Sequence, residues 1–319
     1  MRARLAAIAV AAIVAALLPT TSNVAAQPIP GTTCNLFPAN NILNTDISSL
    51  AVASQSAMWK NNMAQNAKLH PDLGTVAQQY GMPLNVAPPP TTGLTPTFGY
   101  YSQSDHPAEG YPIDQSTLIQ GGPSAPSGSD RHALVVNKNS CKLYELYNLQ
   151  NFTTGQQPSA GSGAVWDLTS NAMRTDGFTS ADAAGLPIFP AIVRFDDVAR
   201  GIVRHAMRVT VRRTRRAYVY PARHFASRDT NASLPRMGDR LRLRRDFDVS
   251  IFPAHAQAVL RGLQQYGMFV ADNGANWLLS IAPDRRIQGL DSLARVKGSD
   301  FEVVVPTGPD EGPRRHPVR

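Results

Sequence analysis

The sequence predicts a mainly β protein, an antiparallel β-sandwich or a jelly-roll-like open barrel with a few short helices at its edges. Three observations predict this class. The apolar runs are short and mostly alternate with polar residues, no regular helices separate them, and no internal repeat divides the chain. The composition also changes nowhere in a way that would mark two domains, so we expect one domain.

Residues 1–26 have the pattern of a secretory signal peptide. Arg2 and Arg4 form a basic start, residues 5–18 are apolar, and Val24-Ala25-Ala26 fits a cleavage site. The 319-residue chain is then expected to be secreted or periplasmic, with a single β-rich domain over residues 27–305. We expect no membrane span, and the polar, Pro-rich residues 306–319 are expected to form a disordered tail.

The chain contains two cysteines, Cys34 and Cys141. In an oxidising compartment such a pair most simply forms a disulfide, which would pin the N-terminal segment onto the middle of the chain. The alternative is two buried free thiols.

The formal net charge is +8, and Lys occupies only five of the 31 basic positions, so Arg dominates. Arg suits bidentate contacts with carboxylates and phosphates, although a GC-rich genome produces the same bias. A basic exported protein is compatible with an extracellular glycan as partner, an acidic one included, or with an anionic envelope. Nucleic acid is not an expected partner outside the cell, and the sequence gives no oligomeric state.

The secondary-structure signals come in order along the chain. Strands are expected where apolar residues alternate with Arg, so that each strand has one apolar and one basic face. Helices are expected after capping residues and before Gly, and Asn273-Gly274 predicts a hairpin turn. The expected helices are 54–64, a short one from Thr179, 195–200 and 253–266; the expected strands are 203–212, 217–221, 240–244 and the 268–281 hairpin.

The stretch 128–147 predicts a second hairpin and carries the candidate catalytic residues. With Asn137 to Ser140 as the turn, Val136 faces Cys141 and Leu134 faces Leu143. That register places His132 opposite Glu145 and Asp130 opposite Tyr147, all on one face above an apolar floor. Ionisable groups in such a place often have shifted pKa values. The alternative is a sheet edge whose His–Glu pair only holds a loop.

Further candidates lie outside this hairpin. His205 falls on the apolar face of strand 203–212 and would join His132 if the two strands are neighbours, although a lone core histidine is more often structural. Arg131, Arg223 and Asp176 are candidate substrate-binding residues, and Asp182 is expected to favour a helix start. Asp272, before the Asn-Gly turn, is most simply a turn residue.

Long stretches of the chain resemble a family of secreted bacterial proteins with no settled activity. The resemblance covers residues 34–305 and rests on SDRHALVV, LYELY, DGFTSADAAGLPIFPAIVRFDDV, IVRHAM and YGMFVADNG. It implies one exported domain and supplies no catalytic assignment. The positions it marks are Asp130, His132, Glu145, Gly185, Pro187 and His205.

The favoured function is a secreted carbohydrate-active enzyme that cleaves a polysaccharide or cell-envelope glycan. His132 and Glu145 would supply acid–base chemistry, with Asp130 and Tyr147 beside them, and either hydrolysis or elimination fits. No short-range metal-ligand spacing, nucleophile elbow or phosphate-binding loop is present, so we expect no cofactor and no metal. The alternative function is a non-catalytic protein that binds an extracellular glycan or the envelope.

Overall fold

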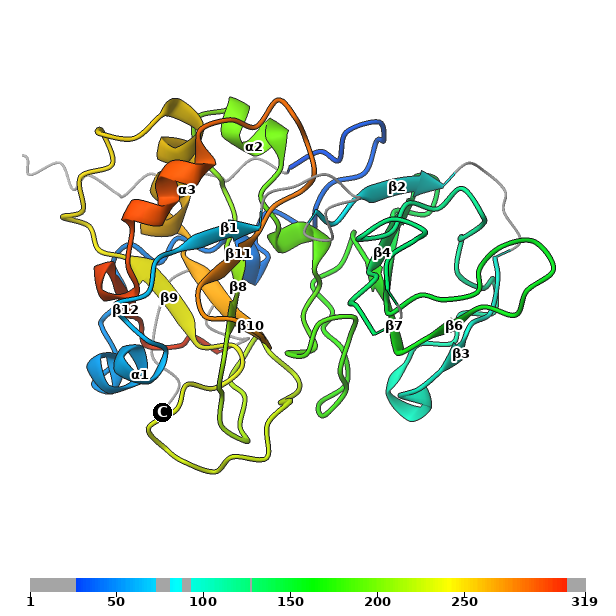
Figure 1. Cartoon of the computed structure of the whole chain (residues 1–319), viewed down its shortest axis with the longest axis horizontal. Helices are drawn as coiled ribbons and strands as arrows, with labels where there is room; N and C mark the ends of the chain where they lie inside the picture. The colour runs from blue at the N-terminus through cyan, green and yellow to red at the C-terminus, as the bar shows by residue number, and fades with distance from the viewer. Residues whose placement is uncertain (1–26, 73–80, 88–92, 127, 309–319) are drawn as a thin grey trace, which may run out of the picture.

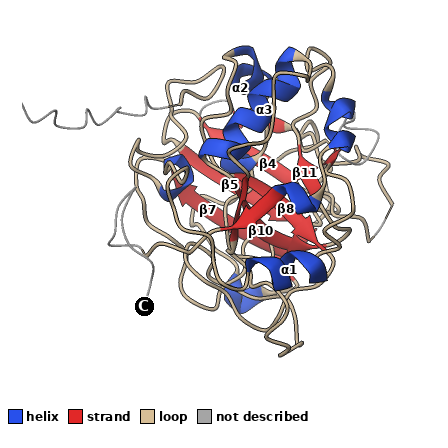
Figure 2. Ribbon diagram, turned by 90° about the vertical axis from the view of Figure 1, so that its left-hand side faces the viewer, coloured by secondary structure: helices blue, strands red, loops and turns tan. Residues whose placement is uncertain are grey.

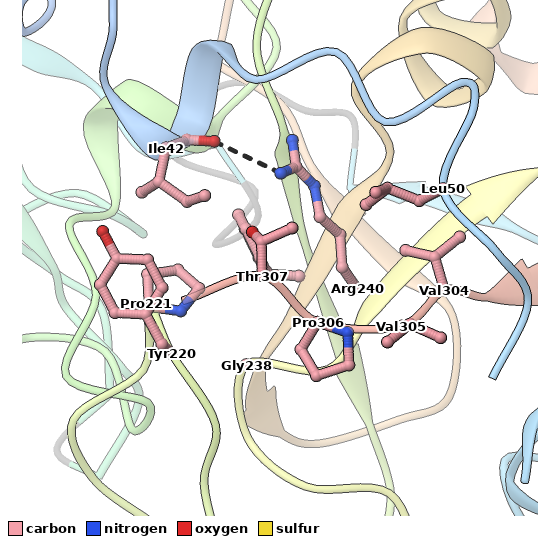
Figure 3. Close-up of a pocket in the computed structure, with 11 residues that line it drawn as sticks. Ile42, Leu50, Tyr220, Pro221, Gly238, Arg240, Val304, Val305, Pro306 and Thr307 are labelled. Atoms are coloured by element: carbon pink, nitrogen blue, oxygen red, sulfur yellow. Dashed lines mark hydrogen bonds between the residues drawn. The ribbon is translucent and has the colours of Figure 1, made fainter. Parts of the chain in front are cut away.

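The computed structural model describes residues 27–72, 81–87, 93–126 and 128–308. The expected signal peptide, residues 1–26, lies outside the described residues, as do residues 309–319 of the expected tail. Thr307 is buried and, with Pro306, lies beside Arg240 (Figure 3), so these two residues of the expected tail are packed against the domain.

A six-stranded mixed sheet forms the larger half of the molecule (Figure 1). Its strands, in spatial order, are β1 (His70–Asp72), β11 (Leu278–Ser280), β8 (Met207–Val211), β10 (Met268–Asn273), β9 (Arg240–Leu243) and β12 (Phe301–Val303). Helix α3 (Ala254–Gln265) packs on the Met207 face of this sheet, close enough for Gly262 to touch Met207. Helix α2 (Phe195–Ala199) packs on α3, and α1 (Ser56–Asn62) packs on β12.

A four-stranded sheet and a two-stranded sheet form the smaller half (Figure 1). The four strands are β2 (Leu84–Ala87), β4 (Ala133–Asn137), β5 (Lys142–Tyr147) and β7 (Ser162–Asp167); β3 (Thr97–Phe98) pairs with β6 (Ser159–Ala160). The described residues also form short 3-10 helices: η1 (Ile42–Asn44), η3 (Tyr101–Gln103), η4 (Phe189–Ala191), η5 (Leu290–Arg295) and η6 (Gly298–Asp300).

One apolar core joins the two halves. It extends from Ile29 to Val303 and includes Leu134, Leu143 and Trp166 of the four-stranded sheet. A smaller apolar cluster covers the other face of that sheet. The expected fold class is confirmed: the protein is mainly β, its strands lie at the centre with short helices outside (Figure 2), and the described residues form no closed barrel.

The sheets are mixed rather than purely antiparallel. The pairs β1–β11, β8–β10, β2–β4 and β3–β6 are all parallel. The predicted 268–281 hairpin is wrong, because β10 and β11 do not pair with each other. Strand β8 lies between them. After the Asn-Gly turn, the amides of Gly274 and Trp277 donate to Val211 and Thr210 of β8. Local turn chemistry therefore set the bend, but a distant strand supplied the hydrogen bonds.

The expected helices 54–64, 195–200 and 253–266 correspond to α1, α2 and α3. The expected helix from Thr179 is absent, because Gly185 and the buried contacts of this stretch hold it in turns. The expected strand 217–221 is only an isolated bridge between Tyr218 and Met237.

The expected basic outer faces of strands are wrong at Arg208, Arg240 and Arg242, which are buried. The Arg residues at the ends of the expected strands are exposed: Arg204, Arg212 and Arg244. Arg240 donates to the Ile42 carbonyl (Figure 3) and to the carbonyls of Tyr266 and Thr45. Its guanidinium group lies over the Phe269 ring, 4.6 Å from the ring centroid. Burial lowers its pKa to about 9. Arg242 donates to three carbonyls between Ile47 and Leu50. These guanidinium groups fasten the irregular N-terminal segment to the sheet.

The expected disulfide is confirmed, since Cys34 is bonded to Cys141 across a sequence separation of 107. Among the described residues, the longest α-helix, α3, has 12 residues, and none of the helices has the length and apolar character needed to cross a bilayer.

The disulfide should contribute strongly to stability, because it closes a long loop in the unfolded chain. We expect the double variant Cys34→Ala/Cys141→Ala to lose about 4 kcal/mol of unfolding free energy, as loop-closure entropy predicts. Urea denaturation, with and without reductant, measures this loss. Equal midpoints for oxidised and reduced protein would show that the N-terminal segment is held by its Arg contacts alone.

Candidate functional site

The hairpin formed by β4 and β5 has a different register from the predicted one. Its turn occupies residues 138–141, so Val136 faces Leu143 and Leu134 faces Glu145. One strand is displaced by two residues relative to the prediction, which preserves the face of every side chain but separates the expected His132–Glu145 pair. The displacement arises at Cys141, which lies in the turn with a positive φ of 49°.

His132 is buried beside Tyr147, with ring centroids 5.6 Å apart. Its Nδ1 lies 2.6 Å from the Gln120 side-chain oxygen, and its Nε2 lies 3.1 Å from the Ala181 carbonyl. Burial lowers its pKa, with the Asp130 charge opposing that effect. Both ring nitrogens are thus engaged by neighbours, which is the arrangement of a positioning residue rather than of a free base.

Glu145 is fully buried and faces inward. Its carboxylate accepts hydrogen bonds from the backbone N–H groups of Ile188 and Phe189 and from the Trp166 indole. Burial raises its pKa to about 7, although these donors oppose the rise. Glu145 therefore fastens the chain near Ile188 to the four-stranded sheet.

His205 does not join His132. It precedes β8, its Nε2 lies 3.3 Å from an Asp197 carboxylate oxygen, and its Nδ1 lies 3.0 Å from the Ala206 carbonyl. Burial would raise the pKa of Asp197, but Arg194, His205 and Arg200 outweigh it and hold that pKa well below its usual range. This ion cluster anchors α2 and is separate from the hairpin.

The expected substrate-binding residues take different places. Arg131 is buried with a positive φ of 43° and donates to the carbonyls of Leu149 and Ala125. Arg223 and Asp176 form an ion pair with each other at 2.9 Å. The expected Arg131 contact with a glycan is therefore wrong, because its guanidinium group satisfies loop carbonyls inside the protein.

Polar side chains from four strands converge on the face of the six-stranded sheet that lies opposite α3. Arg208 of β8 binds both carboxylate oxygens of Asp182 at 3.1 Å and donates to the Ser280 hydroxyl at 2.6 Å. Asp272 of β10 lies 3.8 Å from the same guanidinium group. Asp72 of β1 pairs in register with Ser280. We call these five residues (Asp72, Asp182, Arg208, Asp272 and Ser280) the Arg208 cluster.

The Arg208 cluster holds more carboxylates than its single cation can neutralise. Burial opposes the charge on Arg208, but Asp182, Asp272 and Asp72 raise its pKa above its ordinary value. Burial and the Asp182 charge raise the pKa of Asp272 to about 7, although Arg208 opposes them. Burial also raises the pKa of Asp72, whose carboxylate lies 3.3 Å from His70. A cluster of this kind holds a proton near neutral pH.

Asp130 links the Arg208 cluster to the hairpin. It is exposed, and its charge acts on Asp72 and Asp272 of the large sheet as well as on His132 and Tyr147 of the hairpin. The Asp272 side chain is 30 % exposed and Tyr147 is partly exposed, so solvent reaches this place. The candidate site therefore lies at the junction of the two halves.

Sequence reasoning missed Arg208 and Asp272 as site residues. The alternation in 203–212 did place Arg208 opposite the apolar residues, but an Arg on that face predicts solvent exposure. No local pattern indicates that segment 179–185 lies over this face. The part of the chain that the structure describes has no group of three or more His, Cys, Asp and Glu residues arranged to hold a metal ion.

We expect Glu145→Gln to destabilise the protein, because the amide nitrogen would meet N–H donors in a buried place. The expected loss is about 1–3 kcal/mol of unfolding free energy, with Glu109→Gln, at an exposed ion pair, costing roughly 1 kcal/mol or less. Chemical denaturation measures both. A Glu145→Gln protein of unchanged stability that lacked the glycan cleavage expected from the sequence would support the expected catalytic role of Glu145.

Comparisons of this chain with protein-family models, with curated proteins and with solved structures found no match.

Proposed function

We propose that this protein is a secreted carbohydrate-active enzyme that hydrolyses glycosidic bonds in a polysaccharide or cell-envelope glycan. The single observation that carries the proposal is Asp272, a solvent-reached carboxyl group with a pKa raised to about 7 and a second carboxylate, Asp130, within electrostatic range. Glycosidases place two carboxyl groups in environments that push their proton affinities apart.

Asp272 is suited to act as the general acid. A protonated Asp272 would donate its proton to the glycosidic oxygen as the bond to the anomeric carbon breaks. Asp130 would take a proton from the water whose oxygen bonds to that carbon, so that one water is added across the bond. Arg208, itself held by Asp182, lies 3.8 Å from Asp272, and Tyr147 borders the site.

His132 then has a positioning role. Because both its ring nitrogens have neighbours, Gln120 and the Ala181 carbonyl, it holds the 179–185 segment against the hairpin. Elimination from an acidic sugar needs a free base beside the sugar carbon, and His132 was the candidate for that base. Its engagement favours hydrolysis over elimination.

The second candidate function is a non-catalytic protein that binds an extracellular glycan. It is favoured by two adjacent tyrosines, Tyr100 and Tyr101, which are 56 % and 67 % exposed. Exposed aromatic rings in a secreted protein suit the apolar faces of sugar rings. The same surface would serve an enzyme as a substrate-binding region, so cleavage decides between the two functions.

We expect Asp272→Asn to reduce hydrolysis at least about a hundredfold, the size of effect typical for a general acid. Release of reducing ends from a panel of neutral and acidic polysaccharides measures this on the mature protein. The melting temperature at pH 7.5 should not fall, because the change removes a carboxylate from a crowded acidic cluster. The matched control is Asp248→Asn, at an exposed turn where the carboxylate binds Ser250. Equal activity of both variants would exclude Asp272 as the acid.

The pH dependence should follow Asp272. Its carboxyl must be protonated to act, and its pKa is raised to about 7, so kcat/KM should fall as the pH rises above about 7. The folded pKa is also above the usual value near 4, so the stability from this group falls as pH rises from about 4 to about 7 and is level above that. Rate and melting-temperature profiles measure both trends, and Asp272→Asn should flatten the stability trend. A rate that still rises above pH 8 would contradict this assignment.

A further inference from the structure

A second feature of the surface lies on the two-stranded sheet, beside the candidate site. Tyr101 and His106 form an aromatic pair with ring centroids 4.3 Å apart, and Phe98 of β3 packs edge-on with His106, with ring centroids 5.4 Å apart. Together with the peptide 94–97 and the loop 156–158, they line a groove of about 550 Å³. This volume falls in the range of small-ligand sites. We call it the aromatic groove.

The aromatic groove is held by ordered contacts. The backbone of β3 pairs with β6, and Phe98 packs edge-on against the buried Tyr111. The His106 Nε2 lies 3.0 Å from the Tyr101 carbonyl, which fixes the ring pair to its own loop. The rings are therefore positioned before any ligand arrives, which reduces the entropy cost of binding.

Backbone hydrogen bonds through Gly161 connect Tyr147 of the candidate site to the segment that carries Tyr101. The Gly161 N–H donates to the Tyr147 carbonyl, and the Tyr100 N–H donates to the Gly161 carbonyl. The Tyr147 ring lies directly over Gly161, where even a Cβ atom would collide with it. Asp130, Asp272 and Tyr100 all act on Tyr147. The backbone hydrogen bonds of Gly161 thus connect Tyr147 of the candidate site to Tyr100, the residue before Tyr101.

The lining of the aromatic groove has the chemistry of a sugar site. Apart from His106 it consists of apolar, hydroxyl and amide side chains, and its described lining has no Lys, Arg, Asp or Glu. The larger groove of about 790 Å³ near α2 differs, because Arg200, Arg286, Asp196 and Asp284 line it. An uncharged groove with stacking rings suits an uncharged ligand whose faces are apolar and whose edges carry hydroxyl groups.

We propose that the aromatic groove binds neutral sugar units of the glycan whose cleavage was proposed above, with Tyr101 stacking on a sugar ring outside the Asp272 site. This inference rests on the proposed function for the place of cleavage but not for binding itself. It assigns the substrate class as a glycan with neutral units over this stretch, whereas net charge alone pointed toward an acidic one.

The test uses the mature protein carrying Asp272→Asn, so that cleavage does not disturb binding. Affinity electrophoresis in gels that contain a neutral β-glucan, glucomannan or α-glucan should retard it, and polygalacturonate or alginate should retard it less. Adding Tyr101→Ala should weaken binding about tenfold, the loss expected for one well-placed aromatic contact. Tyr101→Phe should bind like the parent, because the ring face remains. The matched surface control is Val52→Ala, since Val52 is another exposed apolar side chain.

The outcomes separate this inference from the proposed function. Binding that depends on Tyr101, together with no cleavage by the unmodified protein, supports the aromatic groove and rejects the enzyme. Cleavage that depends on Asp272, together with binding and KM values unchanged by Tyr101→Ala, supports the enzyme and rejects the groove. Retardation by none of the neutral gels, or by the anionic gels alone, also rejects the groove. Because Tyr101 is exposed, a misfolded Tyr101→Ala protein is not expected, and its melting temperature checks this.

Discussion

The structure depends on one constraint, the burial of an irregular segment, residues 179–193, between the two halves of the molecule. Nearly every residue in it is buried, yet it forms little regular structure, so its backbone groups need partners from elsewhere. The Glu145 carboxylate accepts hydrogen bonds from two backbone N–H groups of the segment, and the His132 Nε2 lies 3.1 Å from the Ala181 carbonyl. The Ser162 hydroxyl and the Ala271 carbonyl bind it from either side. The polar residues that resembled a catalytic set are thus what allows this segment to be buried.

Asp182, in the same segment, connects this constraint to the candidate site. The Asp182 side chain is fully buried, and burying its negative charge without a cation would cost free energy. Arg208 provides that cation and donates two hydrogen bonds to the carboxylate. Removing one partner of such a buried pair typically costs about 3–5 kcal/mol. The pair also affects neighbouring carboxyl groups, because the negative charge of Asp182 offsets much of the positive charge of Arg208. Burial and the Asp182 charge therefore raise the pKa of Asp272 more than Arg208 lowers it. A structural interaction and a proton-holding carboxyl group arise from the same arrangement.

Function would follow from where the two halves meet. The large sheet brings Arg208 and Asp272, and the hairpin brings Asp130 and Tyr147. The 3-10 helix η3, which follows β3 of the two-stranded sheet, extends the surface with Tyr101. None of these sheets alone combines a carboxyl group of raised pKa with a place for a sugar chain to lie. The disulfide and the buried guanidinium groups of Arg240 and Arg242 lie outside the candidate site. They hold the N-terminal segment against both halves.

The sequence by itself determined the features that depend on local pattern or on simple chemistry. These were the mainly β class, the three helices, the disulfide, and the face of the hairpin on which His132 and Glu145 stand. Alternation fixes which face a side chain occupies, and capping residues and Gly fix where a helix begins and ends. The tertiary structure alone decided the register of the hairpin, the insertion of β8 between β10 and β11, and the burial of Arg208. Asp272 could not be chosen from sequence, because its raised pKa depends on burial and on Asp182, a residue ninety positions away that folding of the 179–193 segment brings near it.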